Sequence, residues 1–101
     1  MGRRRRVAER SQVIVTHVVP TPASAEERAR GLVAWVRCTV NGLRLDGLTI
    51  RRTRAGRVAV AFPARRDRWG DKHPVVAPVG KAARREIEKV ILFAVGPEIL
   101  R

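Results

Sequence analysis

Side chains that could do chemistry gather in one stretch of the sequence, FPARRDRWGDKHP, which runs from Phe62 to Pro74. It offers two carboxylates, Asp67 and Asp71, beside His73, and such groups serve in general acid–base catalysis. A nucleophilic site also needs a serine or cysteine next to its base, and this stretch has neither. We therefore expect no catalytic residue and no enzymatic activity, and we interpret His73 as a structural residue that holds the loop by hydrogen bonds.

Metal binding by the same residues is not expected either. Asp71 and His73 would need further ligands, and His17 and Cys38 are too scattered to complete a structural zinc site. We expect no metal, no cofactor and no small-molecule substrate. A single cysteine cannot form an internal disulfide and is typical of a reducing compartment, so we expect a cytoplasmic protein.

The charge of the chain points to a different kind of ligand. The 101 residues carry 22 Lys+Arg against 9 Asp+Glu, a formal net charge of +13. Residues 1–11 are expected to be a disordered basic tail, and the rest of the chain is basic without them. A balance of this kind favours nucleic acid as the partner, followed by anionic lipid. The alternative is that the arginines only form solvated surface.

Basic side chains of the quoted stretch form the predicted binding surface together with the start of a C-terminal helix. Arginine binds phosphate bidentately, and a helix start adds free N–H groups that favour phosphate. Trp69 is expected either to stack on an unpaired base or to plug the edge of the core. The predicted nucleic-acid-binding residues are Arg65, Arg66, Arg68, Trp69, Lys72, Lys81, Arg84, Arg85 and Lys89. Four more arginines are expected at the opposite end of the sheet: Arg51, Arg52, Arg54 and Arg57.

The elements that must position these residues follow from the hydrophobic pattern. Runs of β-branched residues between turn signals predict strands, and apolar residues three and four apart predict the helix, which Gly96 and Pro97 end. Ser24 and Glu27 have the spacing of a capping box and predict a helical turn. Strands are expected over Gln12–Val19, Leu32–Val40, Leu43–Arg52 and Arg57–Phe62, a short extended piece over Val75–Val79, and the helix over Lys81–Val95. On this helix Arg84 and Glu88 can pair across one turn.

Together these elements predict an α+β fold, an antiparallel sheet of four to five strands in meander order with one C-terminal helix laid on it. The single domain is expected over residues 12–96, followed by a C-terminal tail over residues 97–101. The second strand is apolar on both faces, because Val33 and Trp35 lie opposite its main apolar face. One helix covers only one face, so we expect Trp35 in the core or at a dimer interface.

The third strand changes phase in its middle. Leu43 and Leu45 are odd positions, whereas Leu48 is an even one, and Asp46 and Gly47 lie between them. A β-bulge, in which a glycine absorbs one extra residue, would return the leucines to one face. A second tight hairpin is the alternative, and its arms would be only three residues long. The bulge is the favoured interpretation.

These motifs resemble those of the SpoVG family of small bacterial regulators (stage V sporulation protein G, septation regulators). The resemblance covers about residues 13–92 and is densest over residues 43–74, where LRLDGLTI, RAG and VAVAFPARR match the family's third strand, glycine turn and fourth strand with its F/M-P-small-K/R ending. Asp71, His73 and Pro74 match its D-x-x-HP element, although here the aspartate precedes the histidine by two positions. REIEKVIL follows at the place of the family's helix.

The resemblance implies an antiparallel sheet with a C-terminal helix, a homodimer, and site-selective binding of DNA or RNA in the cytoplasm without catalysis. Departures from the family are the arginine tail, the long loop PTPASAEERARG and the replacement of a Ser/Thr-rich helix start by Pro78-Val79-Gly80. The family's binding residues correspond here to Arg65 and Arg66 in the loop and to Lys81, Arg84, Arg85 and Lys89 on the helix.

We therefore expect a non-catalytic nucleic-acid-binding regulator, resembling septation and sporulation regulators, that contacts phosphates through the loop 65–72 and the start of the helix. The alternative is a protein-interaction adaptor that docks an acidic partner through its sheet edge or outer face. No run approaches the roughly 20 apolar residues of a membrane span, and we expect no membrane partner. Contact of Arg3–Arg6 with anionic lipid is the least favoured hypothesis.

Overall fold

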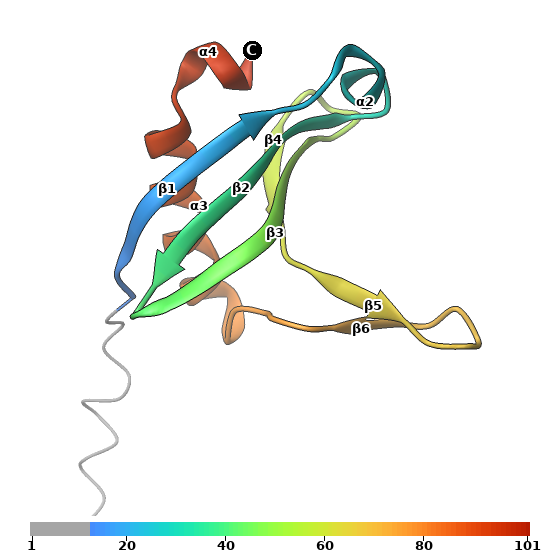
Figure 1. Cartoon of the computed structure of the whole chain (residues 1–101), viewed down its shortest axis with the longest axis vertical. Coiled ribbons are helices and arrows are strands. Elements are labelled where there is room, and N and C mark those ends of the chain that lie inside the picture. Colours follow the sequence, from blue (N-terminus) through green and yellow to red (C-terminus); the bar gives the residue numbers. More distant parts are fainter. Residues whose placement is uncertain (1–12) are drawn as a thin grey trace, which may run out of the picture.

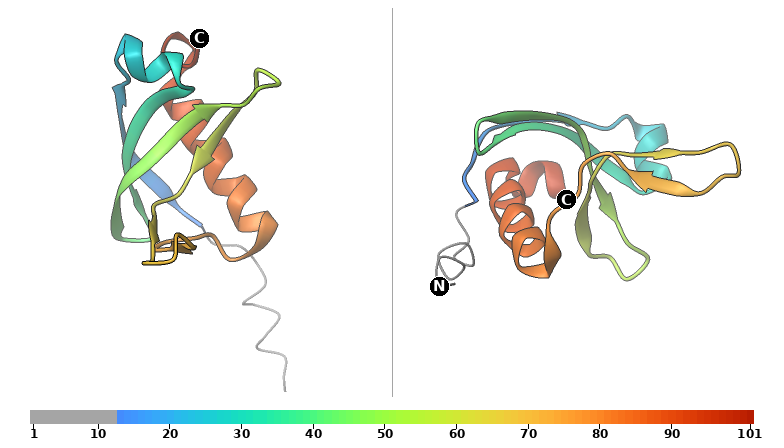
Figure 2. Two further views of the ribbon diagram at one scale, coloured as in Figure 1. Left: turned by 90° about the vertical axis from the view of Figure 1, so that its right-hand side faces the viewer. Right: turned by 90° about the horizontal axis from the view of Figure 1, so that it is seen from below.

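The fold is a four-stranded antiparallel sheet that curls around one long helix (Figures 1 and 2). The computed structural model describes residues 13–101, so the basic tail expected over residues 1–11 lies outside the described residues. In chain order the elements are β1 (Val15–Pro22), α2 (Ala25–Ala29), β2 (Leu32–Val40), β3 (Leu43–Arg52), β4 (Val58–Ala61), β5 (Ala64–Arg66), β6 (Lys72–Pro74), α3 (Gly80–Val95) and α4 (Pro97–Leu100). None of these helices of the described part is long and apolar enough to cross a membrane.

The main sheet has the strand order β1-β2-β3-β4 with every neighbouring pair antiparallel, which confirms the predicted α+β meander with a C-terminal helix. Strand β2 turns into β3 at Asn41 and Gly42, both at positive φ, which is typical of an Asn-Gly pair in a tight hairpin. The capping box of α2 also forms: the Ser24 hydroxyl accepts from the Glu27 amide, and the Glu27 carboxylate accepts from the Ser24 amide.

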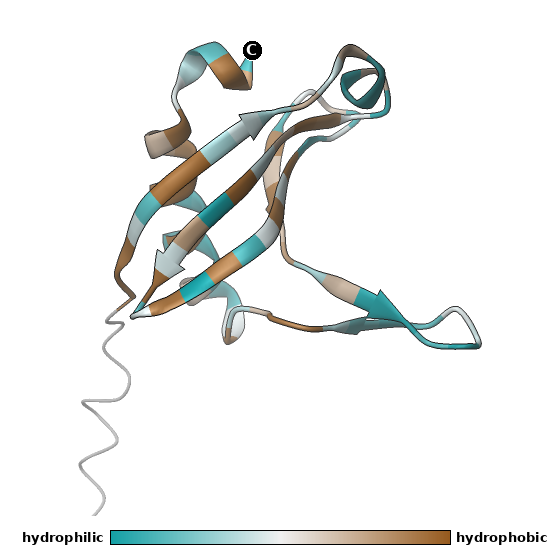
Figure 3. Ribbon diagram, in the orientation of Figure 1, coloured by the Kyte–Doolittle hydropathy of each residue, from teal (hydrophilic) through white to brown (hydrophobic). Residues whose placement is uncertain are grey.

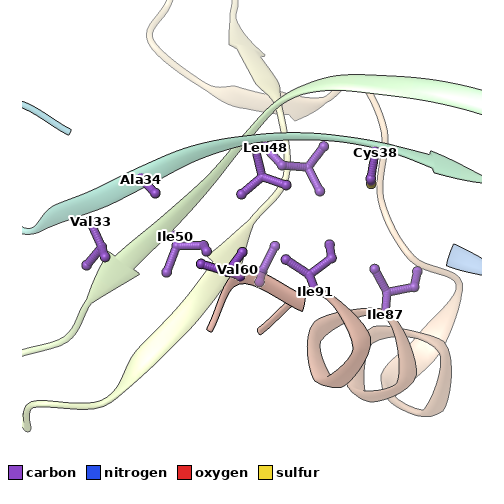
Figure 4. Packing of buried hydrophobic residues seen from close by; sticks show 10 residues of the cluster. Val33, Ala34, Cys38, Leu48, Ile50, Val60, Ile87 and Ile91 are labelled. Carbon is purple, nitrogen blue, oxygen red and sulfur yellow. The ribbon is translucent and has the colours of Figure 1, made fainter. Parts of the chain in front are cut away.

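The core lies between the concave face of the sheet and α3 (Figure 4). Val36 of β2, Leu48 and Ile50 of β3 and Val60 of β4 are all at most 2% exposed. Helix α3 places Ile91, which is 0% exposed, in the middle of this face. Full burial of a side chain of this size contributes roughly 1.5–3 kcal/mol, so the apolar stripe of α3 is what holds the helix on the sheet.

The phase change in β3 is a β-bulge. Leu48 lies opposite Val36 and Leu45 lies opposite Cys38, so that Asp46 and Gly47 together face the single residue between them on β2. Gly47 has φ +84°, a conformation that glycine adopts without a Cβ clash. The predicted bulge is confirmed, and the alternative of a second hairpin is wrong.

Strand β1 begins and ends three residues later than predicted. Thr16 lies opposite Thr39 and Val19 opposite Arg37, so β1 carries one extra residue between them, and His17 has φ 51°. The bulge lets pairing continue through Pro20. The prediction had ended the strand before this proline, but β1 is an edge strand, where the missing N–H breaks no ladder hydrogen bond.

The largest difference from the predicted fold lies between β4 and α3. The short extended piece expected over residues 75–79 does not add a fifth strand to the main sheet: it contains Pro78 and has no partner strand, and the amides of Val75 and Val76 both bond to the Pro63 carbonyl. Instead β5 and β6 pair as a separate two-stranded ribbon that projects from the body (Figure 1). We call this ribbon, residues 64–74, the arm.

The chain end also differs from the expected tail over residues 97–101. Gly96, at φ 90°, ends α3, and Pro97 starts the short helix α4. Ile99 and Leu100 of α4 pack against the hydrophobic core. The sequence Gly-Pro therefore marks a change of direction between two helices.

Candidate nucleic-acid interface

The arm carries its cationic side chains on both faces of an exposed ribbon. Arg65 lies opposite His73, and Arg66 lies opposite Lys72. Because side chains alternate along a strand, Arg66 and Lys72 share one face and Arg65 lies on the other. All residues of β5 and β6 are exposed, and the ribbon is mostly hydrophilic (Figure 3).

The tip of the arm is organised by one carboxylate. Asp67 Oδ1 accepts hydrogen bonds from the amides of Trp69 and Asp71, each at 2.9 Å, and Asp67 Oδ2 lies 2.8 Å from His73 Nε2. The His73 contact is the largest of the causes that hold the pKa of Asp67 below its ordinary value, followed among the lowering causes by the amides of Asp71, Trp69 and Gly70. The predicted structural role of His73 thus matches its contact, and the carboxylate pairs with the histidine rather than with the neighbouring arginines.

Trp69 stands at the tip with 75% of its surface exposed, so the prediction that it plugs the core edge is wrong. The Arg68 guanidinium lies over the indole, 5.0 Å from the ring centroid. This contact stabilises an exposed ring through cation–π attraction. A ring held in this way can stack on a base, which is the alternative that the sequence left open.

Arg66 and Lys72 form a like-charge pair directly across the two strands. Such pairs destabilise a ribbon, and here Arg66 Nη1 is partly held by the Gly70 carbonyl at 2.8 Å. The electrostatic repulsion between Arg66 and Lys72 falls when an anion lies between or beside them. A phosphate group is an anion that both side chains bind well.

A second row of cations runs along α3. Lys81, Arg85 and Lys89 are exposed and follow each other at intervals of four, so they form one stripe, which we call the helix stripe. Phe93, 88% exposed, comes four residues later and extends it, although sequence reasoning missed this residue. The sequence signal that could have identified Phe93 is its position outside the apolar face of the helix. The first turn of α3 has no acidic residue, and its N-cap Val79 makes no side-chain cap, which leaves amides open to an anion.

Arg84 lies apart from this stripe. Its guanidinium stands 5.5 Å from the centroid of the Phe62 ring and donates to the carbonyl of Val60 at 3.4 Å. The predicted pair of Arg84 with Glu88 is replaced by two contacts with one residue, because Glu88 Oε2 accepts from the Val60 amide at 2.7 Å. Arg84 therefore helps to hold α3 on β4.

The base of the arm meets the start of α3 at a hollow of about 280 Å³. Lys72 and Arg84 both line it, together with Phe62 and Pro74. The structure thus brings one predicted loop residue and one predicted helix residue to the same place. Arg66 lies level with Lys72 on the ribbon, and Arg65 lies one pair nearer its base, whereas Arg68 and Trp69 lie beyond the paired residues at the tip.

Two of the four arginines at the opposite end of the sheet, Arg51 and Arg52, have structural contacts. Arg51 donates to the Arg30 carbonyl at 3.2 Å. Arg52 donates to the Gly56 carbonyl at 3.3 Å and also to the Leu100 carbonyl. These guanidinium groups join β3 to the α2 region, to the next turn and to α4, so part of the chain's charge serves the fold.

Asp67 and His73 are both solvent-accessible, and within residues 13–101 no three side chains of the His, Cys, Asp and Glu types gather around one point.

The chain matches no protein-family model, and no curated protein is significantly similar to it. The exposed cations of the arm and of the helix stripe are suited to contact with a polyanion.

Proposed function

We propose that this protein binds DNA or RNA through the arm and the start of α3, as a non-catalytic regulator of the kind that the SpoVG resemblance implies. The observation that carries the proposal is the arm itself, an exposed ribbon with Arg65, Arg66, Arg68 and Lys72 around a supported Trp69. Four cations are set against Asp67 and Asp71, and Asp67 is already bonded to His73.

Repulsion within the site supports the same proposal. Arg66 faces Lys72 across the arm, and Arg85 has a like charge one turn away on each side. These arrangements cost stability in the free protein. Phosphates of a bound strand would neutralise them and release counterions, which makes the binding dependent on salt.

The adaptor hypothesis has less support at the β4 edge around Val60 and at the β1 edge. Val60, on the β4 edge, has its amide bonded to Glu88 and its carbonyl to Arg84. The β1 edge contains Pro20 and Pro22, which have no N–H for an added strand. The proposal therefore takes nucleic acid as the ligand, and it includes a cytoplasmic homodimer as the working form.

A titration with single- and double-stranded DNA and RNA at two salt concentrations tests the proposal. The slope of log K against log salt should change by about 0.9 per duplex phosphate contact and about 0.7 per single-strand contact. Charge reversal of Arg65 and Arg66 should remove most of the binding. The matched control reverses Arg54 and Arg57, which are exposed at the opposite end of the sheet.

Three outcomes would contradict the proposal. They are the absence of binding at low salt, binding that is insensitive to salt, and an equal loss of affinity in the two charge-reversed variants. Equal losses would mean that only net charge matters and that the arm has no special part.

A further inference from the structure

The outer face of the main sheet, opposite α3, is open over much of its length (Figure 2). Alternation along β2 places Trp35, Arg37 and Thr39 on this face. Trp35 is 43% exposed, so of the two expected positions the core is wrong, and the dimer interface stays a prediction. Val33, which the sequence pattern put on this face, is only 2% exposed and belongs to the core cluster with Ala34 and Ile50, because the register of β2 and β3 shifts between Leu32 and Ala34. The alternation that exposes Trp35 begins after this shift.

Neighbouring strands surround Trp35 with small polar side chains. Thr21 of β1 and Thr49 of β3 lie opposite it on its two sides. Farther along β2, Arg37 lies opposite Val19, and Thr39 lies opposite Arg44. The Trp35 indole therefore projects beyond the shorter side chains beside it.

Two hollows adjoin on this face. The first, of about 160 Å³, is lined by Trp35, Arg37, Val19 and Asp46 among others. The second, of about 320 Å³, shares Arg37 and Val19 with the first and reaches Arg44. Together they make a shallow track along β2 that begins at an aromatic ring and ends between two guanidinium groups.

Charge decides which partner suits this track. A second copy docked through the same face would bring two arginines, Arg37 and Arg44, and one carboxylate, Asp46, against an identical set, so that like charges outnumber opposite ones and oppose association. A polyanion is attracted by the same groups. Duplex bases are stacked within the helix and cannot reach an indole on a sheet, whereas single-stranded bases stack readily on aromatic side chains, and an open four-stranded sheet with exposed aromatics is a common platform for single-stranded RNA.

We propose that the outer face is a second nucleic-acid site, selective for single strands, in which Trp35 stacks on a base and Arg37 and Arg44 hold the adjoining phosphates. The inference rests on the proposed function for the class of ligand, but its residues are separate from the arm. Asp46 lines the first hollow, and its Oδ1 accepts a hydrogen bond from the Gly47 amide at 3.0 Å. Its negative charge repels the phosphates of a bound nucleic-acid strand.

The test uses labelled oligo(dT) and oligo(U) of about 12 nucleotides, a length within the range of single-strand sites, and a duplex of equal length. Trp35→Thr removes the ring, and threonine is already the residue type of both cross-strand neighbours. It should weaken single-strand binding by about fivefold to a hundredfold, the effect of one lost stacking contact, and change duplex binding by less than about twofold. Trp35→Phe should keep most of the affinity, and Asp46→Asn should raise it.

A spectroscopic readout accompanies the affinities. In a Trp69→Phe variant, Trp35 is the sole tryptophan, and oligo(U) should quench its fluorescence as the base stacks. Unchanged single-strand affinity of Trp35→Thr, or no quenching, would overturn the inference while leaving the arm in place. Equal losses for single strand and duplex, together with a lower mass in sedimentation, would show an interface between copies instead. Failure of the unmodified chain to bind any of the probes would refute the proposed function as well.

Discussion

Glu88 of helix α3 accepts a hydrogen bond from the backbone amide of Val60 at 2.7 Å, and this contact closes the free edge of β4. Arg84, one turn earlier, donates to the carbonyl of the same residue. Val60 is 1% exposed, so water has little access to either group. The two charged side chains thus replace the hydrogen bonds that a fifth strand would have made.

Replacing Glu88 with alanine should lower the free energy of unfolding by about 1–3 kcal/mol, because it leaves a buried amide without an acceptor. For a domain of this size each kcal/mol corresponds to about 4–8 °C in Tm. Glu86→Ala is the control, since Glu86 is an exposed acid on the same helix. Chemical denaturation of both variants measures the difference, and equal effects would remove the special role of Glu88.

Asp67 should titrate below its ordinary pKa of 3.8, because the His73 hydrogen bond, and after it the amides at the arm tip, stabilise the carboxylate. Its pKa is lower in the folded than in the unfolded chain. The carboxylate therefore stabilises the tip fully above the ordinary pKa, and this contribution is lost as the pH falls through the lowered value. Carbon-detected NMR titration measures the midpoint, and a midpoint at or above 3.8 would disprove the assignment. In Asp67→Asn the Trp69 amide should exchange with solvent faster at neutral pH.

Arg85→Gln should act in opposite directions on stability and binding. It removes two repulsions across one helical turn, with Lys81 and with Lys89, each of a few tenths of a kcal/mol, so the free energy of unfolding should rise slightly at low salt. Affinity for nucleic acid should fall, and the salt slope should shrink by about 0.7–0.9. A loss of both stability and affinity would mean that Arg85 belongs to the fold rather than to the helix stripe.

Gly47→Ala should cost about 1–2 kcal/mol, because a residue with a Cβ is strained at φ +84°. The cost is purely conformational, since no atom lies within 4 Å of the Cβ position. Gly47→Asn should cost less, because asparagine tolerates this region better. Thermal unfolding of the two variants gives the comparison, and an equal loss in both would point to a cause other than the backbone angle.

Much of the main sheet could be predicted because its signals are local. The phase of the leucines around Asp46 and Gly47 required an extra residue, and the Ser24 and Glu27 spacing specified a capped turn. The predicted positions of β2 and β3 agree with the structure to the residue. Strongly alternating segments between turn residues leave few other pairings.

The arm could not be predicted, because β5 and β6 have no apolar alternation to reveal them. Their pairing depends on a loop in which Asp67 binds two backbone amides and Gly70 takes a positive φ. The choice between the core and a dimer interface for Trp35 could not be made for a related reason. An apolar residue on the second face of a strand indicates that something packs against that face. The sequence does not say whether this is another segment of the same chain or a partner.

The guarded edges of the main sheet also determine how copies of the chain can assemble. Open edges let identical sheets extend one another without limit, which is the route to fibrils. Here the β4 edge is occupied by Arg84 and Glu88, and the β1 edge is interrupted by Pro20 and Pro22. Over residues 43–48, β3 has no partner strand on the β4 side among the described residues, so this short segment is the part of the edge that stays open. We therefore expect edge pairing between copies, where it occurs, to be limited to this segment and to give a closed twofold pair rather than a fibril.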